Sequence, residues 1–270
     1  MASVAEKRAK FRELHKSGCF VIPNPWDVGS ARILAHMGFK ALASTSAGFA
    51  WAIGKPDHLI TLEEILAHLT ELCAATDLPV NADFESAFAM RPEDVAKNVT
   101  AAIKTGVAGL SVEDTKEDGS GLYDKAFAVE RIKAALGAVK ASGQDVLLVA
   151  RSEHMLHDPK ALTPAIDKLV AFADAGADVL FAPGVKDKAE IAQMVKAVAP
   201  KPLSVLVMGP EMSVQEYADL GVRRLSVGAS LARVATSAFE AAADQLMAGS
   251  FAGLSNVPSS RRLNDIFRGF

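Results

Sequence analysis

Short apolar runs alternate along this chain with longer segments that have helical periodicity. The runs have the length and composition of buried parallel strands, and each is followed by a segment with one apolar face. Eight strands are predicted, near residues 20–22, 41–44, 80–82, 109–112, 146–150, 179–181, 203–207 and 225–227. Helices are predicted near residues 28–37, 61–75, 92–105, 126–140, 161–175, 188–198, 213–220 and 229–247, with a further helix within residues 1–18.

A glycine recurs where a predicted helix ends shortly before a strand. It is found at Gly38, Gly106, Gly176 and Gly221. Glycine closes a helix in the left-handed conformation, so these positions predict one type of short helix–strand loop used four times. Eightfold strand–helix alternation predicts a closed (β/α)8 barrel of the TIM type. An open doubly wound sheet is the alternative, although no G-x-G-x-x-G follows the first strand.

The length of 270 residues, with 50% hydrophobic positions, suits one large domain. We expect the barrel to occupy residues 1–248 and a helical tail to occupy residues 249–270. The end of the tail is amphipathic and carries Leu263, Ile266 and Phe267. These side chains need an apolar surface, either on their own barrel or on a neighbouring subunit.

Charge and cysteine usage exclude several classes of protein. The net charge is −3 and no basic tract is present, so nucleic acid is not an expected partner. No apolar stretch approaches the ~20 residues of a membrane span, and the N-terminus lacks the apolar core of a signal peptide. Cys19 and Cys73 lie far apart and outside any metal-type spacing, which favours a reducing cytoplasm.

Four carboxylates follow or end predicted strands: Asp57, Asp83, Glu85 and Glu113. Strand ends converge on one face of a barrel, and Asp83 and Glu85, as residues i and i+2, share one face of a regular strand. We therefore predict a site for Mg²⁺, with Mn²⁺ as an alternative, in which Asp83 binds the ion directly and the other acids hold its water ligands. A solvated loop with ordinary acids is the competing interpretation.

Two further features could bind an anion. Thr45, Ser46, Ala47 and Gly48 form a small, hydroxylated and flexible segment whose N–H groups and hydroxyls suit a carboxylate or phosphoryl oxygen, although such clusters are often plain turns. Arg151 ends an apolar run, where its forked guanidinium could bind a substrate carboxylate. A structural ion pair of Arg151 with Glu153 or Glu113 is the alternative.

The polar loop after the fourth strand, residues 114–123, contains two glycines and could close over a substrate. An ordinary long loop is the alternative. The six histidines show no ligand spacing, and His154, Tyr123 and solvent all remain candidate proton donors.

Four segments together resemble the isocitrate lyase and phosphoenolpyruvate mutase superfamily, over about residues 11–247. They are TSAG at 45–48 followed by GKPD at 54–57, PVNADFE at 79–85, GLSVED at 109–114 and VARSE at 149–153. Their order and intervals make the set specific, although each segment alone is weak.

The resemblance implies a (β/α)8 barrel that uses Mg²⁺ to bind 2-oxo acids and to stabilise an enolate when a C–C or C–P bond breaks. It implies that Asp83 is the direct metal ligand, with Asp57, Glu85 and Glu113 around it. Thr45, Ser46 and Ala47 would hold the substrate carboxylate, and Arg151 its other oxygens. Exchange of the last helix between subunits would give a homodimer or homotetramer.

Departures from the family pattern narrow the function. The loop at 116–121 lacks the lyase cysteine, and Ala182-Pro183 replaces the mutase histidine after the sixth strand. We expect a Mg²⁺-dependent lyase that decarboxylates, or cleaves by a retro-aldol step, a small 2-oxo or 2-hydroxy di- or tricarboxylic acid. Asp57 and Glu113 are its candidate bases. The alternatives are C–P hydrolysis or mutation of phosphonopyruvate, and a non-catalytic 2-oxo-acid binding protein.

Overall fold

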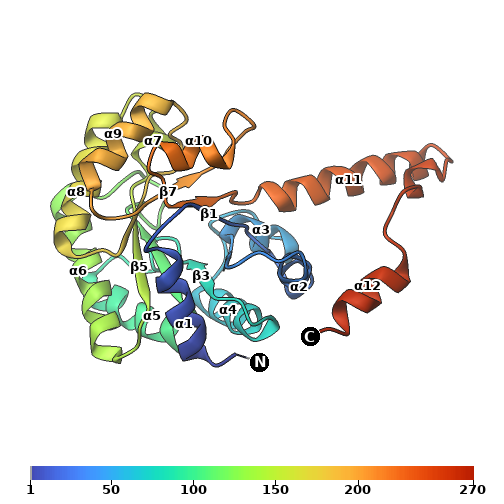
Figure 1. Ribbon diagram of the computed structural model, residues 1–270, viewed down its shortest axis with the longest axis horizontal. Coiled ribbons are helices and arrows are strands. Elements are labelled where there is room, and N and C mark those ends of the chain that lie inside the picture. The colour runs from blue at the N-terminus through green and yellow to red at the C-terminus, as the bar shows by residue number, and fades with distance from the viewer. Residues whose placement is uncertain (1) are drawn as a thin grey trace.

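Eight parallel strands form the centre of the molecule in a computed structural model that describes residues 2–270 (Figure 1). Their order is β1-β8-β7-β6-β5-β4-β3-β2, so neighbours in sequence are neighbours in the sheet, and β1 returns beside β8. At the seam between β1 and β2, the Ala43 N–H donates to the Pro23 carbonyl at 3.0 Å. The sheet is thus a nearly closed barrel, and the predicted (β/α)8 fold is confirmed.

The strands lie where the apolar runs predict them, with shifts of at most one residue at their ends. They are β1 Phe20–Ile22, β2 Leu42–Ala43, β3 Val80–Asp83, β4 Gly109–Glu113, β5 Leu147–Arg151, β6 Val179–Phe181, β7 Leu203–Leu206 and β8 Arg224–Ser226. Three strands therefore end on a residue predicted to belong to the site: Asp83, Glu113 and Arg151.

Helices surround the barrel and include two that the sequence pattern did not indicate, α3 and α7. The barrel helices are α1 Val4–Leu14, α2 Val28–His36, α3 Ser46–Ala52, α4 Leu62–Ala75, α5 Pro92–Lys104, α6 Lys125–Ser142, α7 His154–His157, α8 Leu162–Ala175, α9 Lys188–Val198 and α10 Val214–Asp219. Gly38, Gly106, Gly176 and Gly221 all have positive φ, as the repeated helix–strand loop requires. Met1, part of the predicted N-terminal helix, lies outside the described residues.

Helix α1 closes the amino-terminal end of the barrel. Phe11 is fully buried there against Ile22 and Leu147. Lys7 donates through Nζ to the Cys73 carbonyl at 2.7 Å, at the end of α4, and Arg8 donates through Nη2 to the Ile103 carbonyl at 2.9 Å, at the end of α5. Cations at helix ends suit the partial negative charge there, so α1 is held both by apolar packing and by charge.

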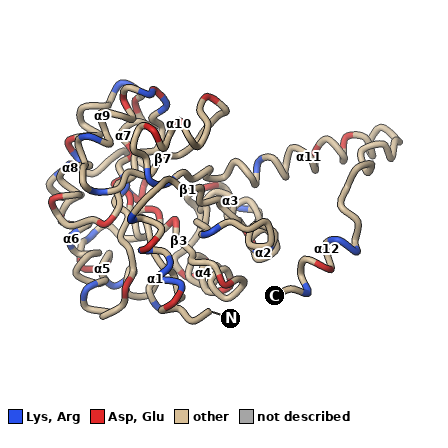
Figure 2. The backbone as a smooth tube through the Cα atoms, viewed as in Figure 1, with Lys and Arg blue, Asp and Glu red and all other residues tan. Residues whose placement is uncertain are grey.

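The last part of the chain leaves the barrel as a long arm. Helix α11 (Ser230–Met247) projects away from the strands, and the chain then turns through η1 (Ala252–Leu254) to α12 (Ser260–Phe267) (Figure 1). Few charges lie along α11 (Figure 2). Helix α12 packs beside α2, with Ile266 buried and the Arg32 guanidinium 5.6 Å from the Phe270 ring centre. Among residues 2–270, no helix combines the length and apolar character needed to cross a membrane.

The buried histidine at the end of α1 makes stability depend on pH. The His15 ring lies edge-on to Phe11 and Phe20, and its Nε2 has no partner among the described residues. Burial, and next the charge of Arg224, lower the pKa of His15 to about 3. The unfolded chain, with an ordinary histidine pKa near 6.5, therefore takes up a proton first as the pH falls.

We expect wild-type protein to lose about 2 kcal/mol more stability than His15→Phe between pH 7 and pH 5, because only wild type has this group to protonate on unfolding. Urea unfolding at the two pH values measures the difference. His36→Phe, at an exposed position on α2, is the control and should follow wild type. Equal pH dependence of wild type and His15→Phe would contradict this prediction.

Candidate active site

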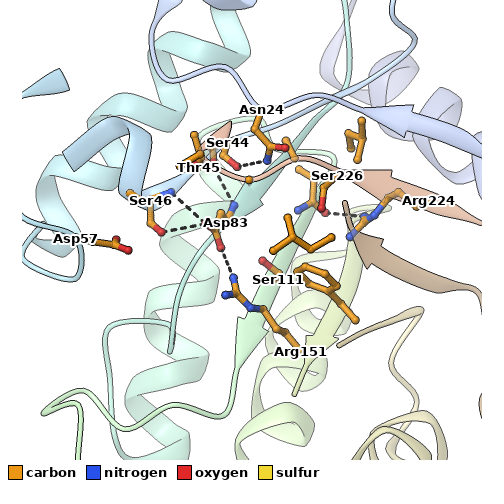
Figure 3. Close-up of a pocket in the computed structure, with 18 residues that line it drawn as sticks. Asn24, Ser44, Thr45, Ser46, Asp57, Asp83, Ser111, Arg151, Arg224 and Ser226 are labelled. Carbon is orange, nitrogen blue, oxygen red and sulfur yellow. Dashed lines mark hydrogen bonds and ion pairs between the residues drawn. The ribbon is translucent and has the colours of Figure 1, made fainter. Parts of the chain in front are cut away.

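A cavity of about 210 Å³ opens at the carboxyl ends of the strands and extends into the barrel. Its lining comes from both halves of the barrel (Figure 3). The polar residues around it are Asn24, Ser44, Thr45, Ser46, Asp57, Asn81, Asp83, Ser111, Arg151, Arg224 and Ser226. Phe181 and Leu206 supply part of its apolar wall.

Asp83 lies at the mouth of this cavity and is held on both carboxylate oxygens. Its Oδ2 accepts hydrogen bonds from the backbone N–H of Ser46 at 3.1 Å and from the Ser46 hydroxyl at 3.0 Å. Its Oδ1 accepts from Arg151 Nη1 at 3.0 Å (Figure 3). Direct metal binding by Asp83, as predicted, would replace one of these contacts.

Arg151 is the central cation of the site. Besides Asp83, its Nη1 lies 3.3 Å from Glu113 Oε2, and its Nε donates to Glu153. Its guanidinium also lies over the Phe181 ring, 5.3 Å from the centre. These carboxylates raise the pKa of Arg151 against the effect of burial. Arg151 therefore makes the ion pairs with Glu153 and Glu113 that were the alternative interpretation, and it also lines the cavity.

Glu113 is the most buried acid of the group, with a side chain only 4% exposed. Burial raises the pKa of Glu113 to about 8, and the nearby Arg151 opposes this shift. Glu113 and Arg151 are register partners on β4 and β5, so the backbone itself brings the two charges together. A further cation beside Glu113 would favour its ionised form.

Asp57, His58 and Glu85 form a second group next to Asp83. One ligand atom from each lies within 4.8 Å of the others. Interaction with the Glu85 carboxylate raises the pKa of His58 to about 9, and the two side chains lie 3.9 Å apart. Burial raises the pKa of Glu85, whose Oε1 has no hydrogen-bond partner among residues 2–270.

The prediction that Asp83 and Glu85 share a strand face is wrong. Strand β3 ends at Asp83, and Glu85 has a φ of 44° in the tight turn that follows. Glu85 consequently faces His58 and a neighbouring hollow rather than the cavity that Asp83 lines. Ala87 and Phe88 also have positive φ, which is strained for residues other than glycine.

Arg131 of α6 stabilises the strained turn after β3 through hydrogen bonds to its carbonyls. Its guanidinium donates to the carbonyls of Ser86, of Ala89 at 2.8 Å and of Met90 at 3.1 Å. It also donates to the Glu113 carbonyl at 3.1 Å, at the end of β4. One buried arginine therefore fixes the turn that carries Glu85 relative to the strand that carries Glu113.

The carboxylates fit a hard divalent cation. Oxygen donors dominate the group, and two of them, Glu85 and Glu113, are buried in a way that disfavours their charge. The unpartnered Oε1 of Glu85 is a ready ligand atom. Calcium and magnesium prefer such oxygen donors, and a bound ion would offset the excess of negative charge.

The segment with Thr45, Ser46, Ala47 and Gly48 is not a flexible loop, as the sequence suggested, but the start of α3. Thr45 is the N-cap, and its hydroxyl accepts from the Gly48 N–H at 3.2 Å. Thr45, Ser46 and Ala47 line the cavity, whereas Gly48 is packed behind it. Small residues allow this helix to begin directly against the strand ends.

The loop at 114–123 forms a small hairpin beside the site. Thr115 and Leu122 make an antiparallel bridge, and the Lys116 N–H donates to the Gly121 carbonyl at 2.9 Å. The near side of the loop, Thr115 to Gly119, borders a second hollow of about 660 Å³ that Glu85, Glu113 and His58 also line. The acids are divided between the two hollows, with Asp57 and Asp83 on the first and Glu85 and Glu113 on the second, and the loop borders only the second.

Neither named candidate for a proton donor lines the 210 Å³ cavity. The Tyr123 hydroxyl donates to Glu117, and its ring lies 4.5 Å from the Arg131 guanidinium. Burial, and next this hydrogen bond, raise the pKa of Tyr123. His154 is hydrogen-bonded to Ser152 at 3.0 Å. Solvent is the remaining candidate of the three.

Sequence reasoning missed several polar residues of the site, among them His58, Asn81 and Arg224. His58 directly follows Asp57, and Asn81 precedes Asp83 by two residues on the inward face of β3. Arg224 lies in an apolar strand, which is the same signal that identified Arg151. The pattern of the strands could therefore have identified Asn81 and Arg224, whereas the position of His58 depends on how the loop after α3 folds.

This geometry, a barrel with carboxylates and an arginine at its strand ends, is that of a known class. The chain belongs to the isocitrate lyase/phosphoenolpyruvate mutase superfamily, a superfamily of lyases and mutases. The family model described as phosphoenolpyruvate phosphomutase matches residues 11–247. The resemblance drawn from the motifs is thereby confirmed.

Individual relatives differ in how far their activity is known. A crystal structure from Burkholderia cenocepacia J2315, described as that of a lyase/mutase, superposes on this chain with a TM-score of 0.95. The two chains are 42% identical, and the match covers 98% of this chain and 97% of the other. An uncharacterized protein of Mycobacterium tuberculosis (strain H37Rv) is 32% identical and covers 81% of each chain. The oxaloacetate decarboxylase of Pseudomonas entomophila is 30% identical and covers 82% of this chain and 78% of its own.

The packing behind α3 makes a prediction about Gly48. A Cβ at this position would lie 2.7 Å from Thr45 Cγ2 and 3.1 Å from Trp26 Cβ. Rotation of Thr45 to relieve this clash would break its cap on α3. We expect Gly48→Ala to lower the free energy of unfolding by about 1–2 kcal/mol.

The matched control is Gly137→Ala, in the middle of α6, where a Cβ meets nothing within 4 Å. That change should stabilise the protein by about 0.5–1 kcal/mol, because alanine favours a helix over glycine. Urea unfolding measures both variants. A Gly48→Ala protein as stable as wild type would show that α3 is not packed as described.

Proposed function

We propose that this protein is a Mg²⁺-dependent lyase that breaks a C–C bond in a small 2-oxo acid, and that decarboxylation of an oxaloacetate-like substrate is its reaction. The observation that carries the proposal is the group of buried carboxylates around Arg151 at the mouth of a small cavity. The oxaloacetate decarboxylase relative supports it.

The absence of a thiol from both hollows favours decarboxylation among the lyase reactions. Cys19 and Cys73 are the chain's two cysteines, and neither lines the 210 Å³ or the 660 Å³ hollow. Decarboxylation needs no thiol, because water can protonate the product. Both cysteines are free, which fits the reducing cytoplasm that we propose as the location of the enzyme.

Binding and orientation are the main tasks of the chain's own residues. Arg151 presents a fixed guanidinium to a substrate carboxylate, and Thr45, Ser46 and Ala47 border the same space. Asp57, Asp83, Glu85 and Glu113 would hold Mg²⁺, some of them through water. When bound, Mg²⁺ supplies Lewis-acid polarisation of the substrate's oxygens.

In the proposed step, the bond between the carboxylate that leaves and its neighbouring carbon breaks. Carbon dioxide departs, and the electron pair remains on the pyruvate fragment as an enolate. A proton from water then forms the methyl group of pyruvate. Arg151 stabilises negative charge on the oxygens of that fragment throughout.

Pyruvate release tests this proposal. Purified protein with Mg²⁺ should release pyruvate from oxaloacetate faster than the uncatalysed reaction. Asp83→Ala should lower kcat/KM by at least about 100-fold, because it removes a metal-site oxygen and leaves Arg151 with one fewer partner. Glu71→Ala, at an exposed position on α4, is the control and should retain wild-type activity.

Other substrates distinguish the alternative functions. Phosphate release from phosphonopyruvate, or a shifted phosphorus resonance, would replace decarboxylation by C–P chemistry, for which the family description is the support. Tight binding of 2-oxoglutarate with no turnover of any candidate would favour a binding protein. Full activity of Asp83→Ala on oxaloacetate would rule out the proposed mechanism.

We also propose that the enzyme is a homo-oligomer assembled through α11. This helix leaves large apolar side chains in solvent, with Phe239 74% and Met247 90% exposed. Phe251, directly beyond it, is 76% exposed. Large apolar side chains exposed along one helix are typical of a protein–protein interface, and a second copy of the chain can cover them.

We expect Phe239→Glu to convert a dimer or tetramer to monomer, because a charge would be buried in the interface. Light scattering coupled to size-exclusion chromatography measures the mass. Met37→Glu, at a similarly exposed apolar residue directly after α2, is the control and should leave the mass unchanged. A monomeric wild-type protein would contradict this proposal.

A further inference from the structure

Arg224 is a buried cation inside the barrel, beneath the acids of the site. It is the first residue of β8, its exposed fraction is 3%, and it lines the same cavity as Asp83 and Arg151 (Figure 3). Its Nε donates to the Ser204 hydroxyl at 3.0 Å, and its Nη1 donates to the Asn81 amide oxygen at 3.3 Å. Both partners are neutral.

The charge of Arg224 has no counter-ion in the part of the chain that the structure describes, residues 2–270. No carboxylate lies within ion-pair distance, whereas Arg151 contacts three. The two hydrogen bonds engage two of the five N–H groups of the guanidinium. Burial lowers the pKa of Arg224 to about 9, so the side chain remains charged at neutral pH. A buried cation without a partner is costly, and an anion in the cavity would relieve that cost.

The depth of Arg224 matches the length of a short diacid. Its partner Asn81 precedes Asp83 by two residues on β3, which corresponds to roughly 6.6 Å along the strand. Four linked carbons span about 4 Å between their ends, and the carboxylate oxygens extend this reach. One carboxylate at the level of Asp83 and Arg151 would thus place the other near Arg224.

The volume of the cavity favours a small ligand. At ~30 Å³ for each water molecule in the liquid, 210 Å³ corresponds to roughly seven waters. A dry cavity of about 150 Å³ accommodates benzene, so the space inside the barrel suits a molecule slightly larger than benzene. A diacid of four carbons fits within this space, whereas a tricarboxylic acid of six or seven carbons would extend beyond its mouth.

We propose that Arg224 forms an anion subsite within the barrel that binds the second carboxylate of a four-carbon diacid, while Arg151 and the acid group hold the first. This subsite rests on the proposed function and narrows its substrates to short diacids. Asn81 and Ser204 orient the guanidinium, and its remaining N–H groups are the donors for the ligand.

Paired ligands test the subsite without relying on turnover. Malate and 2-hydroxybutyrate share four carbons and a 2-hydroxyl, and they differ by one carboxylate in place of a methyl group. In the presence of Mg²⁺, we expect wild type to bind malate roughly ten- to hundredfold more tightly, as measured by calorimetry. Equal affinity for the two acids in wild type would overturn the subsite, whatever the variants do.

The variant arm uses Arg224→Gln, which should lose the preference for malate while its affinity for 2-hydroxybutyrate stays within about twofold. Arg224→Lys keeps the charge and should retain part of the preference, which separates lost charge from disturbed packing. Arg223→Gln is the matched control: its Nη1 donates to the Gly18 carbonyl outside the barrel, and the preference should be unchanged. A preference for malate that survives in folded Arg224→Gln would overturn the subsite.

Failure of the subsite and failure of the proposed function give different results. If malate discrimination depends on Arg224 but oxaloacetate is not decarboxylated, the subsite stands and the decarboxylase proposal falls. If wild type decarboxylates oxaloacetate and folded Arg224→Gln does so with the same KM, the decarboxylase stands and the subsite falls.

Discussion

The burial of Arg151 among carboxylates is the interaction on which the rest of the site depends. Acids at the ends of parallel strands repel one another, and burial penalises each of them further. Arg151 contacts Asp83, Glu113 and Glu153 at once, and its own burial makes those contacts strong. Arg151 does not neutralise all the negative charge, because Asp57 and Glu85 lie beside the group, and within residues 2–270 their recorded basic partner is His58. A site of this kind favours an additional cation.

Polarity changes in layers along the axis of the barrel. Phe11 and its apolar neighbours close the amino-terminal end, polar side chains such as Asn81 and Arg224 fill the middle, and acids surround the opening. In a filled TIM-type barrel the middle layers are usually branched apolar residues. Here small and polar residues replace part of that layer, and a cavity extends inward from the site. The same layering explains why His15, between Phe11 and Arg224, disfavours its charged form.

The elements that flank the site are held from outside the barrel. Helix α3 begins at the strand ends because Thr45 caps it and Gly48 leaves room behind it. The turn after β3 has strained backbone angles, and the hydrogen bonds of Arg131 to its carbonyls compensate for that strain. The start of α3 is thus fixed beside the 210 Å³ cavity, and the turn after β3 is fixed beside the second hollow, which the hairpin at 114–123 also borders.

Much of the fold was determined by the sequence itself, because buried parallel strands and amphipathic helices each have their own periodicity. The eight strands, the glycine-closed loops and the convergence of Asp83, Glu113 and Arg151 follow from that pattern, since residues that end neighbouring parallel strands must meet.

Tertiary structure alone decided the features that depend on local backbone angles and on contacts distant in sequence. Glu85 turned away from Asp83 because the strand ended two residues earlier, and residues 46–52 became a helix because a threonine cap and the packing behind Gly48 stabilise it. Arg224 could be identified in the sequence as a charge in a strand, but whether it has a counter-ion depends on which side chains eight separate strands bring into one cavity.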